Sequence, residues 1–474
     1  MRVSRTARWV AALAAAGALV SCTSSGASGD RGSTPEPAPT TSSTSAPTRT
    51  SPAPPAAPGD WPTYHGDVAR TGFAASMPTV SGPMRIVKRL ALDGAVYASP
   101  LVVRGVTIVA TENNTVYALN AAMQLLWKRH LGPPSPAAER PCGNIDPLGI
   151  TGTPYFNATN DAIFVAPEYS GDPPTHELVS LDFTSGAVKW HRGLDLPGAD
   201  QRVMQERGAL TVSGPRVFVP FGGMAGDCGD YKGRVIGLDR RTGDSPISYT
   251  VPTTREAGIW TPPGPVVGSD GNLLVAVGNG ASGPGDRYDY SDSVLELSPT
   301  TLQRTDSFSP TTWATDNAAD LDLGSQGPAI VGRWVFSAGK SGDAYVLRRD
   351  HLGGIGGQVS KTALCTSFGG TSVVADVVYV PCTDGIRAVR IDGAGTMHVL
   401  WHADGAVTGA PVVGGGRVWS LDTDAGVLHA LDPATGKSRA QITVGGVTRF
   451  ATPALSGARV YLPTQSGLTV VGVS

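Results

Sequence analysis

Short apolar runs recur along most of the chain, and each alternates hydrophobic residues with polar or small ones. Residues 106–110, 216–219 and 459–462 are clear examples, and turns rich in Gly, Asp and Asn separate them from their neighbours. Alternation with a period of two is typical of half-buried strands, and regular turns between such runs indicate short antiparallel hairpins. The pattern therefore predicts an all-β protein.

The predicted strands group into a repeating unit that begins with a small residue, often followed by Pro, and contains about four strands. Successive copies cover residues 98–127, 153–190, 208–251, two copies within 258–350, then 363–401, 410–437 and 451–474. Repeats of this length built from four strands are typical of a β-propeller. Eight copies predict an eight-bladed propeller of four-stranded antiparallel blades.

The last copy is short of one strand, and residues 85–90 form a strand that belongs to no copy of its own. Pairing between this N-terminal strand and the C-terminal strands would complete the last blade. Closure of this kind leaves the ring without a gap between its first and last blades. We therefore expect residues 59–474 to form one closed propeller.

Residues 1–22 read as a bacterial export signal, with arginines near the start and an apolar segment at 9–20. The segment ends Leu-Val-Ser-Cys, which resembles the lipobox of bacterial lipoproteins. That resemblance implies acylation of Cys22 and attachment to the extracytoplasmic face of the cell membrane. The alternative is an ordinary signal peptide with an incidental cysteine. Residues 23–58 are rich in Ser, Thr and Pro, and we expect a disordered tether there.

The net charge bears on the class of partner, and the cysteine content predicts disulfides. The formal net charge is −2, and no basic stripe with interleaved aromatic residues is present, so nucleic acid is not expected as a partner. Beyond Cys22, four cysteines remain, and in an oxidising compartment they predict two disulfides. Four cysteines allow three pairings. We favour Cys365 with Cys382 and Cys142 with Cys228, with four free buried thiols as the alternative.

Two stretches carry a resemblance to a known family. Residues 60–72 read Asp-Trp-Pro-Thr-Tyr-His-Gly-Asp-Val-Ala-Arg-Thr-Gly, and residues 258–350 hold a dense group of Trp, Asn, Asp and Lys. Both resemble the quinoprotein-like propellers, which include pyrroloquinoline-quinone dehydrogenases and cofactor-free relatives. The Leu-Asp-x-x-Thr-Gly turns resemble that family's blade-docking motif, which implies a structural role for Trp127, Trp190 and Trp401.

The resemblance also implies a candidate site within residues 258–350. Trp260 matches the residue under the quinone, Asn279 an amide ligand of calcium, and Lys340 the cation that contacts the quinone. Asp320 and Asp322 lie where the dehydrogenases keep an acidic pair and would be the catalytic residues. A planar cofactor needs a stacking surface, Ca²⁺ needs oxygen ligands, and alcohol oxidation needs a base.

One position departs from the dehydrogenase pattern. The loop that would supply a Glu ligand reads Gly-Asp-Cys-Gly-Asp, with Cys228 at the expected place and Asp227 or Asp230 as the only substitutes nearby. Each remaining site residue also has a structural interpretation. Asn279 can be a turn residue with positive φ, and Lys340 a solvated hairpin tip. Asp320 and Asp322 can cap turns, and Trp260 can pack between blades.

The sequence favours a lipid-anchored, extracytoplasmic propeller that acts as a binding or scaffold module for an envelope protein or glycan. No cofactor is expected under this hypothesis. The alternative is an alcohol dehydrogenase that depends on pyrroloquinoline quinone and calcium, because a fold alone does not fix the function.

Overall fold

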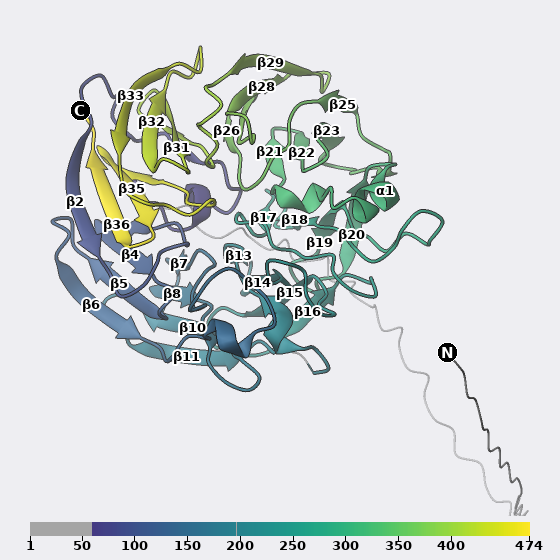
Figure 1. The fold of residues 1–474 in the computed structure, drawn as a ribbon, viewed down its shortest axis with the longest axis horizontal. Helices are drawn as coiled ribbons and strands as arrows, with labels where there is room; N and C mark the ends of the chain where they lie inside the picture. The colour runs from purple at the N-terminus through teal and green to yellow at the C-terminus, as the bar shows by residue number, and fades with distance from the viewer. Residues whose placement is uncertain (1–58, 196) are drawn as a thin grey trace, which may run out of the picture. The chain divides into compact units, whose positions relative to one another are not determined.

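A computed structural model describes residues 59–195 and 197–474, and it shows eight β-sheets arranged as the blades of a propeller (Figure 1). Each sheet has a core of four antiparallel strands, as the repeats predicted. The predicted signal peptide, the tether and Cys22 lie outside the described residues. Among the described residues, no helix is long and apolar enough to cross a membrane.

The first four blades follow one another along the chain. Blade 1 consists of β3 (Leu101–Val103), β4 (Val106–Ala110), β5 (Thr115–Leu119) and β6 (Leu125–His130). Blade 2 consists of β7 (Tyr155–Asn157), β8 (Ala162–Val165), β10 (Thr175–Asp182) and β11 (Val188–Gly193), with β9 (Glu168–Tyr169) added to β10. Blade 3 consists of β13 (Thr211–Ser213), β14 (Arg216–Gly223), β15 (Arg234–Asp239) and β16 (Ile247–Thr250), with β12 (Met204–Gln205) added to β14. Blade 4 consists of β17 (Val266–Val267), β18 (Leu273–Val277), β19 (Ser293–Leu297) and β20 (Arg304–Ser309), with β24 (Gly354–Ile355) added in parallel.

The other four blades complete the ring. Blade 5 consists of β21 (Ala329–Val331), β22 (Trp334–Ala338), β23 (Asp343–Arg348) and β25 (Ser360–Ala363). Blade 6 consists of β26 (Ser372–Val374), β27 (Val377–Val380), β28 (Arg387–Ile391) and β29 (Met397–His402). Blade 7 consists of β30 (Val412–Gly414), β31 (Arg417–Asp422), β32 (Val427–Leu431) and β33 (Ser438–Thr443), with β1 (Phe73–Ala74) added in parallel. Blade 8 consists of β34 (Ala454–Ser456), β35 (Arg459–Thr464), β36 (Gly467–Gly472) and β2 (Arg85–Ala91).

Helical turns are short and occur only in the connections of the described chain. They are η1 (Tyr64–Gly66), η2 (Ala137–Glu139), η3 (Gln201–Val203), α1 (Trp313–Ala318) and η4 (Leu323–Ser325). Of these, α1 and η4 lie between blades 4 and 5, next to the site described below.

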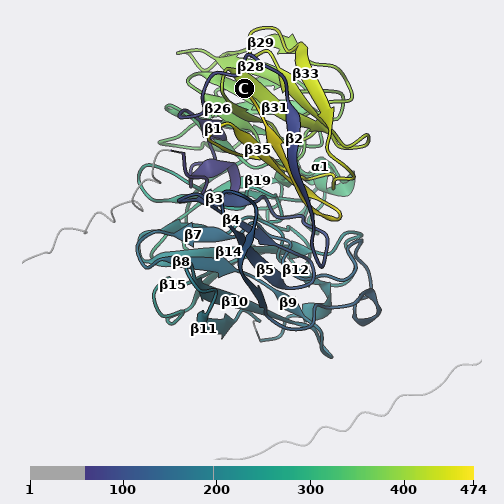
Figure 2. The same ribbon diagram turned by 90° about the vertical axis from the view of Figure 1, so that its left-hand side faces the viewer.

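Closure of the ring occurs where the sequence predicted it. Strand β2 pairs antiparallel with β36, from Arg85 opposite Gly472 to Ala91 opposite Gly467. Figure 2 shows β2 alongside the strands of blade 8, which otherwise come from the C-terminal end of the chain. An N-terminal strand therefore completes a C-terminal blade, and the two ends of the propeller hold each other in place.

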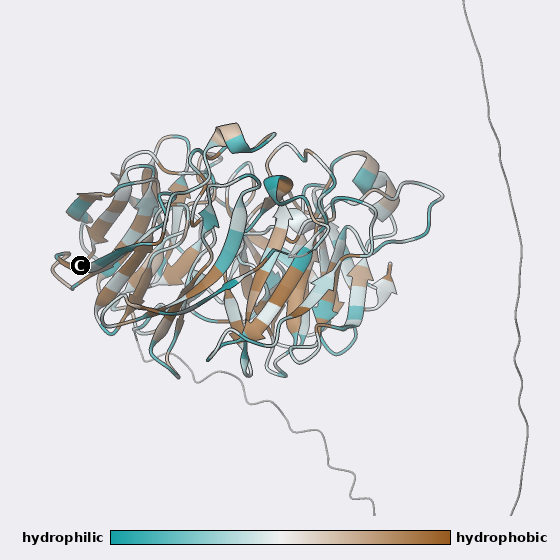
Figure 3. Cartoon of the chain, turned by 90° about the horizontal axis from the view of Figure 1, so that it is seen from below, coloured by the Kyte–Doolittle hydropathy of each residue, from teal (hydrophilic) through white to brown (hydrophobic). Residues whose placement is uncertain are grey.

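The hydrophobic core lies between neighbouring blades. One cluster joins Val103 and Ile108 of blade 1 to Ile163 and Val165 of blade 2, and similar clusters join each later pair. The strands of each blade change in burial from inside to outside: β3 is buried throughout, whereas the outermost β6 is mostly exposed. In Figure 3 the hydrophobic residues accordingly gather on the strands, while the loops are mostly hydrophilic.

The docking tryptophans, Trp127, Trp190 and Trp401, lie on outermost strands and contact the next blade. The indole N–H of Trp401 donates to the carbonyl of Pro433 at 2.8 Å, and that of Trp127 donates to Phe183 at 3.1 Å. The turn glycine of the following blade packs against the ring; at Gly436 an added Cβ would collide with Trp401. These contacts support the structural role that the resemblance implied.

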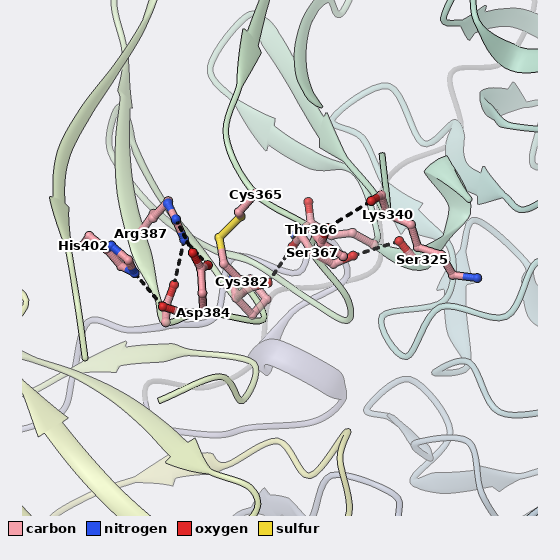
Figure 4. Close-up of a disulfide and its surroundings, with 12 residues drawn as sticks. Ser325, Lys340, Cys365, Thr366, Ser367, Cys382, Asp384, Arg387 and His402 are labelled. Carbon is pink, nitrogen blue, oxygen red and sulfur yellow. Dashed lines mark hydrogen bonds and ion pairs between the residues drawn. A yellow bond between two sulfur atoms is a disulfide. The ribbon is translucent and has the colours of Figure 1, made fainter. Parts of the chain in front are cut away.

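Two disulfides form, with the favoured pairing. Cys142 in the connection between blades 1 and 2 bonds Cys228 in the β14–β15 loop of blade 3. Cys365 bonds Cys382 and ties the connection before blade 6 to the end of β27 (Figure 4). Directly after Cys365, the hydroxyl of Thr366 donates to the carbonyl of Lys340 at 3.1 Å. The segment next to this disulfide therefore also contacts the β22–β23 turn of blade 5.

A fully buried histidine lies in blade 2. His176 contacts Asp195 through Nδ1 at 3.0 Å and Glu168 through Nε2 at 3.3 Å. Burial by itself would lower the pKa of His176, but the two carboxylates overcome that effect and raise it to about 10. The imidazole is therefore charged at neutral pH and forms a buried charge network.

Candidate functional site: a cavity formed by the blade loops

A cavity of about 830 Å³ is lined by loops from nearly every blade. Its walls include aromatic side chains of Tyr64, Tyr97, Tyr231, Trp260, Phe368 and Phe450. The connections that supply them converge only near the centre of the ring, so the cavity lies about the propeller axis at one end. Such a concave, partly apolar pocket with a few polar groups is the usual form of a ligand site.

All five residues that the resemblance indicated line this cavity. They are Trp260 before β17, Asn279 after β18, Asp320 and Asp322 between α1 and η4, and Lys340 in the β22–β23 turn. The sequence predicted the grouping because these loops belong to the adjacent blades 4 and 5.

Lys340 is held by both aspartates. Its Nζ lies 2.6 Å from Oδ1 of Asp320 and also forms an ion pair with Asp322. The side-chain amide of Asn279 donates to Asp320 at 2.7 Å, and its backbone N–H donates to Asp322. Lys340, Asp320, Asp322 and Asn279 therefore form one network, in which the cation is already neutralised by protein carboxylates.

Burial sets the protonation of this network. It raises the pKa of the Asp322 carboxyl, and Lys340 offsets part of that rise. For Lys340, burial works to lower the pKa, but the two aspartates outweigh it and the pKa is raised. The ammonium group therefore stays protonated at neutral pH.

The structural interpretations of two residues are wrong. Asn279 is not among the residues with positive φ, whereas Asp320 is, at 54°. The Lys340 side chain is only 19% exposed and is not a solvated hairpin tip. Both side chains instead contact Asp320 within the network, Asn279 through a hydrogen bond and Lys340 through an ion pair.

The position of the missing Glu ligand is occupied by a disulfide. Cys228 is bonded to Cys142, and of its neighbours only Asp227 lines the cavity. The carboxylate of Asp227 accepts a hydrogen bond from the hydroxyl of Tyr231 at 2.5 Å. Within residues 59–195 and 197–474, no group of three or more His, Cys, Asp or Glu side chains is placed to hold a metal ion. The residues present do not fit the calcium site of a quinone dehydrogenase.

Sequence reasoning missed two arginines of the cavity. The guanidinium of Arg207, between β12 and β13, lies over the Trp260 ring at 4.6 Å from its centroid. Arg449, between β33 and β34, lies over Phe368 at 4.1 Å. A signal was present at Arg207, because the charged pair Glu206-Arg207 directly precedes the buried residues 208–213.

Comparisons with known proteins agree with this architecture. Residues 84–218 match the family model described as outer membrane protein assembly factor BamB. The fold is similar to quinohemoprotein alcohol dehydrogenase from Comamonas testosteroni, with a TM-score of 0.70, 16% identity, and coverage of 88% of this chain and 81% of that chain. It is also similar to BamB from Moraxella catarrhalis, with a TM-score of 0.57, 18% identity, and coverage of 82% of this chain and 100% of that chain. No curated protein sequence matches the chain.

The resemblance to quinoprotein-like, eight-bladed propellers is thus confirmed as a fold. Dehydrogenases and an assembly factor share this architecture, so the similarity alone does not separate the two functions.

Proposed function

We propose that the protein is a binding or scaffold module of the cell envelope, attached to the membrane through a lipidated Cys22. The observation that carries this proposal is the state of the cavity. Lys340, the residue that would contact a quinone, is neutralised by Asp320 and Asp322, and the expected metal-binding Glu is replaced by a disulfide-bonded Cys228. The match to the assembly-factor family supports an envelope protein as the partner.

A second candidate function is favoured by one observation. The structure brings Trp260, Asn279, Asp320, Asp322 and Lys340 to a single cavity, and the fold is shared with a quinohemoprotein alcohol dehydrogenase. The alternative is a dehydrogenase that uses pyrroloquinoline quinone and calcium. Because the donor set does not fit calcium, we place this function second.

One experiment separates the two functions. Purified protein without its lipid is titrated with pyrroloquinoline quinone and Ca²⁺, and quinone absorbance and dye-linked oxidation of alcohols are followed. We expect no turnover. Saturable quinone binding with turnover, lost in both Trp260→Ala and Asn279→Ala, would instead establish the dehydrogenase.

Membrane attachment needs its own test, because Cys22 lies outside the described residues. Metabolic labelling with a radioactive fatty acid should mark the wild-type protein, and Cys22→Ser should lose both the label and its recovery with the membrane fraction. An unlabelled wild-type protein would contradict the lipid anchor and leave an ordinary signal peptide.

A further inference from the structure

Among the described residues that line the cavity, Arg207 is a half-buried cation without a protein counter-ion. Arg207 forms no ion pair with any residue of the described chain, and its Nε is buried without a hydrogen-bond partner. Burial lowers the pKa of the guanidinium, although Tyr231, Asp227 and Asp322 partly counter that effect. A charge that is partly withdrawn from water is costly unless something compensates it, and the stacking contact with Trp260 supplies only part of that compensation.

The nearby acidic groups are already engaged. Asp322 is held by Lys340 and Asn279, and Asp227 accepts the hydroxyl of Tyr231. None of them turns toward Arg207 to form an ion pair. The guanidinium therefore faces the cavity as a free donor fork, a geometry that matches a carboxylate.

The remaining charges of the cavity limit the charge of a ligand. Of the described lining residues, Arg207, Lys340 and Arg449 are cationic, and Asp227, Glu256, Asp320 and Asp322 are acidic. Since acidic groups slightly outnumber cations, a single negative charge beside Arg207 is favoured over a dianion such as phosphate. The aromatic walls supply apolar contact area for a ring.

We propose that this cavity binds a small ligand that carries one carboxylate and a ring, with the carboxylate paired to Arg207. The inference rests on the proposed function, because it treats the cavity as a binding site and not as a quinone centre. The ring lies against the aromatic walls. Side-chain amides such as those of Asn144 and Gln465 are available for its polar groups.

The test compares matched acid and neutral probes by calorimetry and tryptophan fluorescence. Sodium benzoate is compared with benzamide, sodium glucuronate with glucose, and acetyl-alanyl-alanine with its amide, all without quinone or calcium. We expect a ring carboxylate to bind and its neutral partner to bind at least about tenfold more weakly, because a charged hydrogen bond is lost.

Variants assign the effect to Arg207. Arg207→Gln should weaken carboxylate binding by about tenfold to a hundredfold, and Arg207→Lys, which keeps the charge but not the fork, should fall between it and wild type. Arg439→Gln serves as the matched control, because Arg439 is an exposed arginine on the outermost strand of blade 7, paired with Asp432. Near-ultraviolet circular dichroism checks that each variant is folded.

The proposal would be overturned if no ring carboxylate binds at millimolar concentration, if acid and neutral probes bind equally, or if Arg207→Gln binds as wild type does. Binding of the dipeptide acid alone would also overturn it and would indicate a peptide C-terminus instead. Quinone turnover in the earlier titration would refute the proposed function, whereas these outcomes concern Arg207 alone, so the two failures are distinguishable.

Discussion

Replacing Lys340 with methionine should destabilise the propeller, and the loss should depend on pH. The substitution removes the cation that compensates Asp322, whose side chain is only 8% exposed. Methionine keeps most of the volume of the lysine stem, so the change is mainly electrostatic. Removing one partner of a buried ion pair typically lowers the free energy of unfolding by about 3–5 kcal/mol.

Protonation of Asp322 sets an upper limit on this cost. If the intact pair contributes little net stability, the variant loses no more than the free energy of protonating an aspartate, about 4 kcal/mol at pH 7 and about 1.5 kcal/mol at pH 5. Burial without Lys340 leaves the folded-state pKa of Asp322 raised above its unfolded value. The variant is therefore least affected at low pH and loses stability as pH rises.

Urea unfolding followed by tryptophan fluorescence at pH 5 and pH 7 measures the effect. We expect Lys340→Met to lose about 3–4 kcal/mol at pH 7 and no more than about 1.5 kcal/mol at pH 5. Lys340→Met combined with Asp322→Asn should recover most of the loss at pH 7. Asp320→Asn is the control and should stay within about 1 kcal/mol of wild type, because the Asp320 side chain is 73% exposed. A loss below about 1 kcal/mol at pH 7, or one equal at both pH values, would refute the reasoning.

Three other predictions concern the scaffold. Gly436→Ala should lower the free energy of unfolding by about 3 kcal/mol, because φ is +70° and the new Cβ would collide with the docking tryptophan, Trp401. Gly416→Ala, where φ is +71° but no atom lies near the new Cβ, is the control and should lower it by only about 1 kcal/mol. Equal losses in urea unfolding would contradict the docking role. Replacing Cys142 and Cys228 by serine should lower the free energy of unfolding by about 4 kcal/mol, since the bridge spans 86 residues. Its urea midpoint should lie below that of oxidised wild type but above that of fully reduced wild type, which also loses Cys365–Cys382; a midpoint equal to that of oxidised wild type would contradict the prediction. The free energy of unfolding should fall as pH rises from about 6.5 towards 10, because the pKa of His176 is raised to about 10 on folding. In thermal melts, His176→Gln should show a smaller decrease of stability with pH. An unchanged decrease would assign the pH dependence to other groups.

The fold was predictable because its determinants are local. Alternation within residues 106–110 defines a strand, the Gly and Asp turns end it, and repetition of the unit predicts a propeller. Even ring closure could be predicted, since residues 85–90 had no repeat of their own and the last copy had a strand missing. Pairing of β2 with β36 then follows from the need to complete a blade.

The candidate site was predictable only in part. Residues 258–350 form two adjacent blades, so the sequence alone predicts that the loops of Asn279 and Lys340 are neighbours. Arg207 could not be placed in this way, because its contact with Trp260 depends on how the loops of blades 3 and 4 converge. Nor could the sequence show that Lys340 is neutralised by Asp320, since that pairing depends on side-chain directions in the assembled ring.

The charges of the cavity separate into two sets, and the difference between them decides which function is favoured. Lys340, Asp320 and Asp322 satisfy one another, so a quinone could use Lys340 only after disrupting a buried ion pair. Arg207 comes from another blade and lies beyond ion-pair reach of those acids, which leaves its charge for a ligand. A ligand that compensates Arg207 gains that interaction without breaking any other. The arrangement therefore favours binding of a carboxylate over quinone chemistry at the same cavity.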